Sequence, residues 1–266
     1  MKIFDETNCD LILSVVMPTY NEDATLAKIV QSVAKIPNLL EIIIVDDCSV
    51  DRTEEIALEL SAKDARIKYI RLETNQGKTA ALNAGFVHTH GDIVIIQDAD
   101  LEYDPNDIAD VIYPIMADHA DVVYGSRFMV KRAARVIYFW HYLANKALTF
   151  LSNALTNLNM SDVETCYKAF RGDIIRNLKI TSSGFGFEVE VTAKIAKLKC
   201  SIYEVPISYY GRTYAEGKKI GFWDGVAAVW YILQFNIFCT LKSSFRTVPQ
   251  IGSRIVQESS AETDMS

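Results

Sequence analysis

The chain has 266 residues, of which 50% are hydrophobic and 23% are charged, and its formal net charge at pH 7 is −7. A chain of this length and composition can bury one core of ordinary size, with room for a small appended segment. The negative balance argues against general nucleic-acid binding, which uses a basic surface, so we expect no nucleic-acid partner. An anionic ligand would have to be held by a local cluster of Lys and Arg side chains.

The first half of the sequence alternates short β-branched runs with amphipathic patterns. Strands are expected at residues 11–20, 40–47, 67–73 and 91–98, and the segments between them include helical patterns at 23–36 and 51–63. This alternation predicts βαβ units and an α/β fold with a mainly parallel, doubly wound sheet. In such sheets ligands bind at the carboxyl ends of the strands, and here those ends are polar and acidic.

From residue 121 the pattern changes. A short strand is expected at 121–127 and is followed by a basic patch, and then the sequence predicts helices at 136–158 and 187–198, a strand at 201–210 and an aromatic-rich helix at 220–241. We divide the chain into a domain at 10–215, a C-terminal amphipathic helical segment at 216–245 and a polar, disordered tail at 246–266.

The scattered cysteines and the hydropathy of the chain bear on where the protein works. The cysteines lie at Cys9, Cys48, Cys166, Cys200 and Cys239, without metal-ligand spacing. Free thiols of this kind are typical of a reducing compartment, so we expect an intracellular protein. No signal peptide is visible at the N-terminus, and the longest uncharged run, 225–241, is shorter than the roughly 20 apolar residues of a membrane span.

The strand expected at 91–98 runs directly into acidic residues. In an extended chain residues i, i+2 and i+4 point to the same side, so Asp98, Asp100 and Glu102 would converge. Three neighbouring carboxylates repel one another unless a cation joins them, and Mg²⁺ or Mn²⁺ takes such ligands together with substrate phosphates. Asp104, before Pro105, fits the N-cap of the next helix instead. A solvated acidic loop is the alternative to a metal site at this stage.

The order of the motifs "VVMPTYNE", "IIIVDDCSVD", "NQGKTAALNAG", "QDADLEYDP" and "GSR" resembles the inverting family 2 glycosyltransferases, which have a GT-A fold. The later motifs "DVETCYKAFR", "GFGFEVEVTAKI" and "EVPISYYGRTYAEGKK" resemble the branch of dolichol-phosphate mannosyltransferase-like enzymes. Members of that branch move a sugar from a nucleotide to a polyprenyl phosphate. The resemblance covers residues 13–223.

The resemblance implies a set of residues for the nucleotide-sugar donor. They are Pro18, Tyr20, Glu22, Asp46, Asp47, Gly77, Lys78, Asp98 and Ala99. Asp98, Asp100 and Glu102 match the family's motif for Mg²⁺ or Mn²⁺, with Asp100 as the direct ligand. The family often has Gln where this chain has Glu102, which leaves the choice between the two metals open.

The resemblance also implies how the acceptor is held. A phosphate acceptor is already anionic at neutral pH, so it requires cations rather than a general base. The candidates for binding the acceptor phosphate are Arg127, Arg135, Arg212 and Lys218. With Asp100, the three arginines are the expected catalytic residues. Asp162 and Lys168 are expected to shape the sugar pocket, although the neighbouring Thr165-Cys166 replaces the family's commoner Ser-Gly pair.

Together these motifs imply metal-dependent transfer of a hexose, with inversion, from GDP-mannose or a UDP-sugar to a dolichyl or undecaprenyl phosphate. We expect a peripheral protein on the cytoplasmic face of a membrane. Aromatic residues near 136–140 and in 220–241 would contact that membrane. Packing of these segments within the chain or in a homo-oligomer is an open alternative.

Other functions remain open at this stage. A family 2 transferase acting on a hydroxyl group would need a carboxylate base, for which only Asp162 and Glu164 are candidates. A sugar-phosphate nucleotidyltransferase would open with a Gly-rich basic loop, which is absent from "MPTYNEDAT". A non-catalytic, lectin-like descendant is disfavoured by the intact acidic motif.

Overall fold

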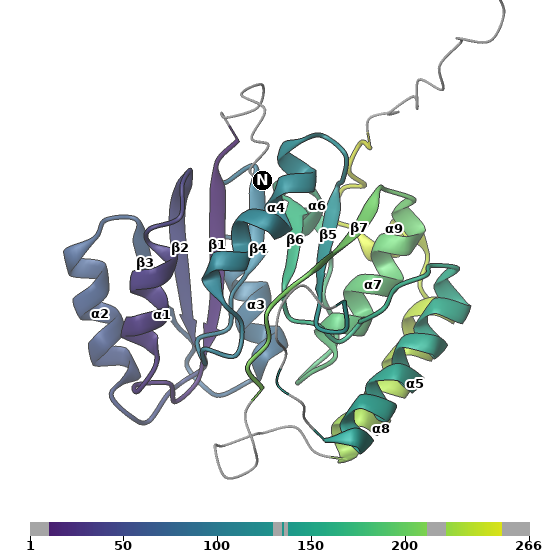
Figure 1. The fold of residues 1–266 in the computed structure, drawn as a ribbon, viewed down its shortest axis with the longest axis horizontal. Coiled ribbons are helices and arrows are strands. Elements are labelled where there is room, and N and C mark those ends of the chain that lie inside the picture. Colours follow the sequence, from purple (N-terminus) through teal and green to yellow (C-terminus); the bar gives the residue numbers. More distant parts are fainter. Residues whose placement is uncertain (1–10, 130–134, 136–137, 212–221, 252–266) are drawn as a thin grey trace, which may run out of the picture.

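The computed structural model describes residues 11–129, 135, 138–211 and 222–251. Within them, one seven-stranded sheet runs through the molecule in the order β3-β2-β1-β4-β6-β5-β7 (Figure 1). The strands are β1 (Leu13–Thr19), β2 (Leu39–Asp46), β3 (Ile67–Arg71), β4 (Ile93–Ile96), β5 (Val122–Ser126), β6 (Lys168–Arg171) and β7 (Ile202–Pro206). The predicted α/β fold with a mainly parallel sheet is therefore confirmed.

The central strands form because their sequences are runs of apolar, mostly β-branched residues. Every residue of β1 and β4 is buried. Helices cover both faces of a parallel sheet, so its strands are apolar on both sides. The parallel register aligns Thr19 with Asp46 and Val16 with Ile96, which places the ends of β1, β2 and β4 at one edge.

β6 differs from its neighbours in direction. It pairs antiparallel with both β4 and β5, whereas β5 pairs in parallel with β7. β5 consequently runs in the same direction as β4, and the residues that precede β6 lie at the edge where β4 and β5 end. The sequence patterns did not predict β6, because this strand has only four residues and both of its ends are charged.

The helices lie between and beside the strands (Figure 1). They are α1 (Leu26–Val33), α2 (Thr53–Lys63), α3 (Lys78–Phe86), α4 (Ile108–Met116), α5 (Phe139–Thr156), α6 (Gly172–Asn177), α7 (Phe187–Leu198), α8 (Phe222–Ile237) and α9 (Leu241–Ser244), with a short 3₁₀ turn at Pro105–Asp107. Asp104 caps that turn by accepting a hydrogen bond from the Asn106 backbone N–H at 3.0 Å, as predicted.

α5, α7 and α8 pack together beside the sheet, and α5 and α8 lie side by side (Figure 1). The C-terminal helix thus joins the body of the domain, although the boundaries 10–215, 216–245 and 246–266 stay predictions. Among the described residues no helix is long and apolar enough to cross a membrane.

Candidate active site

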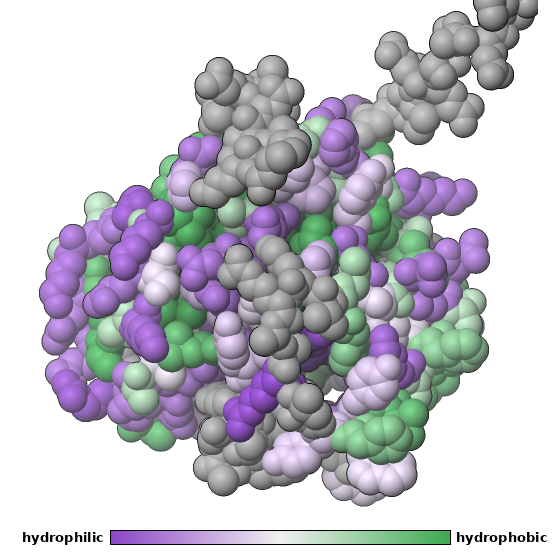
Figure 2. Space-filling view, viewed as in Figure 1, coloured by the Kyte–Doolittle hydropathy of each residue, from purple (hydrophilic) through white to green (hydrophobic). Residues whose placement is uncertain are grey.

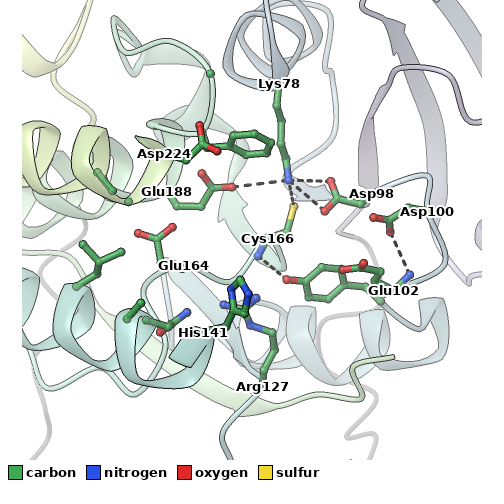
Figure 3. Close-up of a pocket in the computed structure, with 18 of the residues that line it drawn as sticks. Lys78, Asp98, Asp100, Glu102, Arg127, His141, Glu164, Cys166, Glu188 and Asp224 are labelled. Carbon is green, nitrogen blue, oxygen red and sulfur yellow. Dashed lines mark hydrogen bonds and ion pairs between the residues drawn. The ribbon is translucent and has the colours of Figure 1, made fainter. Parts of the chain in front are cut away.

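A cavity of about 1410 Å³ opens where the parallel strands end. One part is lined by residues that directly follow β1, β2, β4 and β5, and the other part by α5 and α8. Tyr20, Asp47, Asp98 and Arg127 represent the four strand ends. The strand ends and α5 come from sequence segments far apart, and the cavity is the place where they meet (Figure 3).

Asp47 fixes one wall of the cavity. Its carboxylate accepts hydrogen bonds from the backbone N–H groups of Gln76 at 2.8 Å and Gly77 at 2.7 Å. Gly77 has φ +87°, a region that L side chains rarely adopt, and it is the N-cap residue of α3. Glycine at this position therefore lets the backbone turn toward Asp47 and present the start of α3, including Lys78, to the cavity.

Lys78 is the central charged group of the cavity. Its Nζ lies 3.0 Å from Asp98 Oδ1, 3.7 Å from Glu188 Oε1 and 2.8 Å from the Cys166 sulfur (Figure 3). Burial by itself would lower the pKa of Lys78, but the charge of Asp98, with Cys166 and Glu188, raises it well above its usual value. Lys78 is therefore a fixed cation that joins α3 to the ends of β4 and β6 and to α7.

The Cys166 thiol does not act as an ionised nucleophile here. Burial first, and then the charge of Asp98, raise its pKa well above the ordinary value. At neutral pH the group stays a thiol, in which form it packs against Lys78. Cys48, Cys166, Cys200 and Cys239 are all free.

The acidic stretch after β4 has a different shape from the predicted one. β4 ends at Ile96, and residues 99–102 form a turn in which Leu101 has φ +62°. The expectation of an extended segment with converging side chains is wrong, because the chain reverses direction immediately after Asp98. Asp98 forms an ion pair with Lys78. Asp100 accepts a hydrogen bond from the Glu102 backbone N–H at 3.0 Å. The Glu102 carboxylate accepts a hydrogen bond from the Tyr209 hydroxyl at 2.7 Å.

All three acids nevertheless line the same cavity. Across the part of the chain that the structure describes, no three His, Cys, Asp or Glu side chains are close enough together to enclose a metal ion. Mg²⁺ often binds through one or two carboxylates, with substrate phosphates completing its coordination. Asp98 and Asp100 fit such an open site, since they offer hard oxygen donors on a wall next to the cation Lys78.

Arg127 extends from the end of β5 and is tied to Asp162. Its Nε lies 2.7 Å and its Nη2 2.8 Å from the two Asp162 oxygens. Burial alone would raise the pKa of Asp162, whose side chain is 0% exposed, but Arg127 holds it below the ordinary value. Asp162 is consequently an anchor for Arg127 and does not face an acceptor as a base, whereas Arg127 itself lines the cavity beside the Tyr209 ring.

Arg135 lies at the mouth of the cavity. Its Nη1 donates to the Gly211 carbonyl at 2.8 Å, and the residue is exposed. It lines the same cavity as Arg127, so two of the three arginines assigned to the acceptor face one cavity. The other two acceptor candidates, Arg212 and Lys218, lie outside the described residues.

Glu164 and Glu188 also face the cavity (Figure 3). One oxygen of each, Glu164 Oε1 and Glu188 Oε2, is buried without a hydrogen-bond partner among the described residues. Burial, and secondarily the charge of Glu188, raise the pKa of Glu164 to about 7. Sequence reasoning named Glu164 only as a candidate base and missed Glu188. The one available signal was the pair of acids, Glu188 and Glu190, that interrupts the apolar start of the helix at 187–198.

Most of the predicted donor residues line the cavity. They are Pro18, Tyr20, Glu22, Asp47, Gly77, Lys78, Asp98 and Ala99. Asp46 is 0% exposed and lies behind the cavity wall. Its carboxylate accepts hydrogen bonds from Ser49, from the Tyr69 hydroxyl at 2.7 Å and from Arg71 at 2.9 Å. These bonds give Asp46 a structural role, and a nucleotide contact for it stays a prediction.

Lys168 does not line the cavity. It is fully buried and donates to the backbone carbonyls of Val163 and Thr165. Lys168 therefore acts on the cavity only indirectly, by holding the turn that carries Glu164. His141 contacts the ring of Tyr138 at a tilted angle and also lines the cavity.

The part of the cavity formed by α5 and α8 is lined largely by apolar residues, with His141, Asn145, Lys146 and Asp224 among them. α5 contributes Ala144, Ala147, Leu148 and Leu151 to it, and α8 contributes Val226, Ala228 and Val229. The same two helices also expose large apolar side chains, which gather over α5 and α8 in Figure 2. They include Phe139, Trp140, Leu143, Phe150, Trp223, Trp230 and Ile237.

The model of the protein family described as "Glycosyl transferase family 2" matches residues 14–179, more than half of the chain. The chain belongs to glycosyl transferase family 2. It is 31% identical over 216 residues to a dolichol-phosphate mannosyltransferase of Pyrococcus furiosus, covering 79% of this chain and 59% of that one. It is 29% identical over 226 residues to an undecaprenyl-phosphate mannosyltransferase of Micrococcus luteus, covering 80% of this chain and 90% of that one.

These relatives confirm the predicted family, its polyprenyl-phosphate mannosyltransferase-like branch and the assignment as a glycosyltransferase. Among solved structures, a Mycobacterium tuberculosis glucosyl-3-phosphoglycerate synthase in complex with Mn²⁺, UDP and phosphoglyceric acid is similar at a TM-score of 0.67 and 18% identity. That match covers 86% of this chain and 80% of the other. It confirms the fold of a GT-A glycosyltransferase.

Proposed function

We propose that this family 2 glycosyltransferase transfers a hexose, with inversion, from a nucleotide sugar to a polyprenyl phosphate. The observation that carries the proposal is the cavity itself. It is lined by Asp98, Asp100 and Lys78, by Arg127 and Arg135, and by apolar residues of α5 and α8. These three kinds of lining suit a diphosphate, an acceptor phosphate and a prenyl chain.

At the donor end, strand-end residues would bind the nucleotide and the diphosphate. Asp47, Tyr20 and Glu22 line the wall for the nucleoside, and Lys78 supplies a buried cation for the phosphates. Asp98 and Asp100 would hold Mg²⁺ or Mn²⁺, in keeping with structural neighbours crystallised with UDP and either Mn²⁺ or Mg²⁺. When bound, such a metal stabilises the charge that develops on the leaving diphosphate.

At the acceptor end, no general base is required, because a phosphate monoester is anionic at neutral pH. Arg127, fixed by Asp162, and Arg135 are cations that line the cavity. Their planar guanidinium groups suit phosphate oxygens and would hold the acceptor in line with the anomeric carbon. Arg212 and Lys218 complete the proposed set.

The prenyl chain would reach the cavity from a bilayer, with α5 and α8 lying at the membrane surface. Trp140 is 74% exposed and also lines the cavity, so the exposed aromatic surface is continuous with the cavity lining. Aromatic and aliphatic side chains on one helix pair suit an interfacial position. The free thiols support the cytoplasmic face.

The decisive experiment is transfer of radiolabelled sugar from GDP-mannose, UDP-glucose and UDP-N-acetylglucosamine to a short polyprenyl phosphate, with Mn²⁺, with Mg²⁺ and with chelator. We expect labelled lipid from one donor, lost with chelator. If the protein binds a donor but gives no labelled lipid with any prenyl length, the proposed acceptor is wrong.

A hydroxyl acceptor is the second candidate, and one observation favours it. Glu164 has a pKa of about 7 and faces the cavity, as a general base would. Glu164 would be the base in place of Asp162, because the Asp162 carboxylate is hydrogen-bonded to Arg127. Transfer by the wild type to a glycan or lipid hydroxyl, and loss of that transfer in Glu164→Gln, would establish this second function.

A further inference from the structure

Two carboxylates in the cavity, Glu164 and Glu188, have no part in the transfer to a phosphate acceptor proposed above. Glu188, in the first turn of α7, is 4% exposed, and its Oε2 has no hydrogen-bond partner in the described chain. Glu164, in the turn before β6, has an unpartnered buried Oε1. Figure 3 shows both carboxyl groups directed into the cavity from different elements. Buried polar atoms are nearly always hydrogen-bonded, so these two oxygens call for an outside partner.

The nearby cations do not satisfy these oxygens. Lys168 donates to backbone carbonyls. Lys78 approaches the other oxygen of Glu188 at 3.7 Å but lies closer to Asp98, at 3.0 Å. The ligand group that pairs with Glu164 and Glu188 must therefore bring hydrogen-bond donors of its own.

The chemistry of the pair selects the kind of ligand. Two carboxyl groups side by side repel a phosphate, so the pair cannot be a subsite for the diphosphate or the acceptor phosphate. Hydroxyl groups of a sugar both donate and accept, and adjacent hydroxyls can donate to both oxygens of one carboxylate. Lys78 links Glu188 to Asp98, so the pair lies one side chain away from the proposed diphosphate position.

We propose that Glu164 and Glu188 form the subsite that binds the hydroxyl groups of the donor hexose and selects among donors by them. This rests on the proposed function, because it takes a nucleotide sugar as the ligand. Glu188 holds hydroxyls on the Lys78 side, and Glu164 holds those toward β6. The pair is thus a determinant of donor specificity in the wall opposite the acidic turn.

The test measures the contribution of the sugar separately from that of the nucleotide. Isothermal titration calorimetry on the full chain would compare GDP and UDP with GDP-mannose and UDP-glucose, for the wild type, Glu164→Gln and Glu188→Gln. Glu59→Gln, on the exposed face of α2, is the matched control. Thermal unfolding shows that each variant is folded. The two glutamates lie on different elements, so one variant can fail without the other.

We expect both cavity variants to bind the nucleoside diphosphates within about twofold of the wild type and to bind the matching nucleotide sugar about tenfold more weakly. Deoxy-sugar donors sharpen the test. The analogue that lacks the recognised hydroxyl should bind the wild type weakly and should lose nothing further in the variant, since the same hydrogen bond is already missing.

Four outcomes would overturn the subsite. Unchanged donor binding with lost transfer would make Glu164 a base. A parallel loss of nucleoside diphosphate and nucleotide sugar would make the pair structural. If the wild type bound no nucleoside diphosphate or nucleotide sugar at all, the proposed function would fail, and the subsite with it. Normal nucleotide-sugar binding that is unaffected by either substitution would remove only the subsite.

Discussion

At the strand-end side of the cavity, charged groups are already paired with one another, whereas at the helical side α5 and α8 present apolar rings to solvent. Asp47 accepts hydrogen bonds from two backbone N–H groups, and Lys78 lies between Asp98 and Glu188. On the helical side, Trp140 and Phe150 are 74% and 75% exposed. The first side is organised before any ligand arrives, while the second buries its apolar surface only against a partner.

The comparison assigns different consequences to substitutions on the two sides. Changes at the strand ends should reduce chemistry or donor binding whatever acceptor is offered. Changes on the exposed helices should matter only when the acceptor is presented in a membrane. Arg135 lies between the two sides and should affect the acceptor without affecting the donor.

The largest expected effect is at Asp100. We expect Asp100→Ala to lower the rate of transfer by about 100- to 1000-fold, as for the loss of one main stabilising group at a reacting centre. Nucleotide binding should weaken mainly when Mg²⁺ or Mn²⁺ is present, because the side chain acts through the metal. Transfer assays and calorimetry with and without metal check this. Asp110→Ala, on the exposed side of α4, is the control, and full activity of Asp100→Ala would exclude the proposed metal site.

Arg135→Ala should reduce transfer by about 10- to 100-fold, the usual range for losing a hydrogen bond to a charged group. Donor binding should stay as in the wild type, since Arg135 lies away from Asp98 and Lys78 at the exposed mouth of the cavity. Steady-state kinetics with varied acceptor, and donor titration, measure the two separately. Arg246→Ala is a matched exposed control. A loss confined to donor binding would move Arg135 out of the acceptor site.

Trp230→Ser and Phe150→Ser together should weaken binding to anionic phospholipid vesicles by about tenfold or more, since each removes a large apolar side chain from the proposed membrane surface. Neither residue lines the cavity, so transfer to a short, water-soluble prenyl phosphate should not change. Vesicle sedimentation gives the first quantity and the transfer assay the second. Tyr113→Ser, on α4, serves for comparison. Unchanged vesicle binding with a change in oligomeric state would identify a protein interface instead.

The smallest effect concerns stability and pH. Burial raises the pKa of Glu164 in the folded state to about 7, and the charges of Glu188 and, less strongly, Asp162 act in the same direction. The positive charges of Lys168 and Arg127 oppose this by lowering the pKa. The folded state therefore holds a proton that the unfolded state releases near pH 4.5, and the free energy of unfolding falls as pH rises from there to about 7.

Glu164→Gln removes the titrating group, so the free energy of unfolding should no longer fall over this pH range because of residue 164. The variant's melting temperature relative to the wild type should rise by about 4–8 °C between pH 5 and pH 8, for roughly 2 kcal/mol in a chain of this size. Differential scanning calorimetry at the two pH values measures it. An equal offset at both would show that Glu164 titrates normally.

The parts of the fold that sequence could predict are those in which one local pattern decides the outcome. β1, β2 and β4 are runs of buried apolar residues, and α7 occupies residues 187–198 as predicted because its apolar positions recur at helical spacing. β6 could not be predicted from Lys168–Arg171 alone, since its pairing with β4 and β5 is a long-range event.

The site divides in the same way. The motifs assigned Asp47, Lys78 and Asp98 to the donor site, and all three line the cavity. Asp46 and Asp47 are adjacent in sequence, yet one is turned into the network of Tyr69 and Arg71 and the other toward Gly77. No composition or spacing rule separates them, because the difference depends on partners from β3 and α3.

The reversed direction of β6 has a consequence for how this enzyme could change its substrate over evolution. A parallel strand would begin at the opposite edge of the sheet, whereas an antiparallel strand brings its own leading turn, with Glu164 and Cys166, to the ligand edge. That turn can exchange residues without altering the register of the neighbouring strands. Donor choice could therefore drift within a few positions of one short loop while the scaffold and the phosphate-handling residues stay the same.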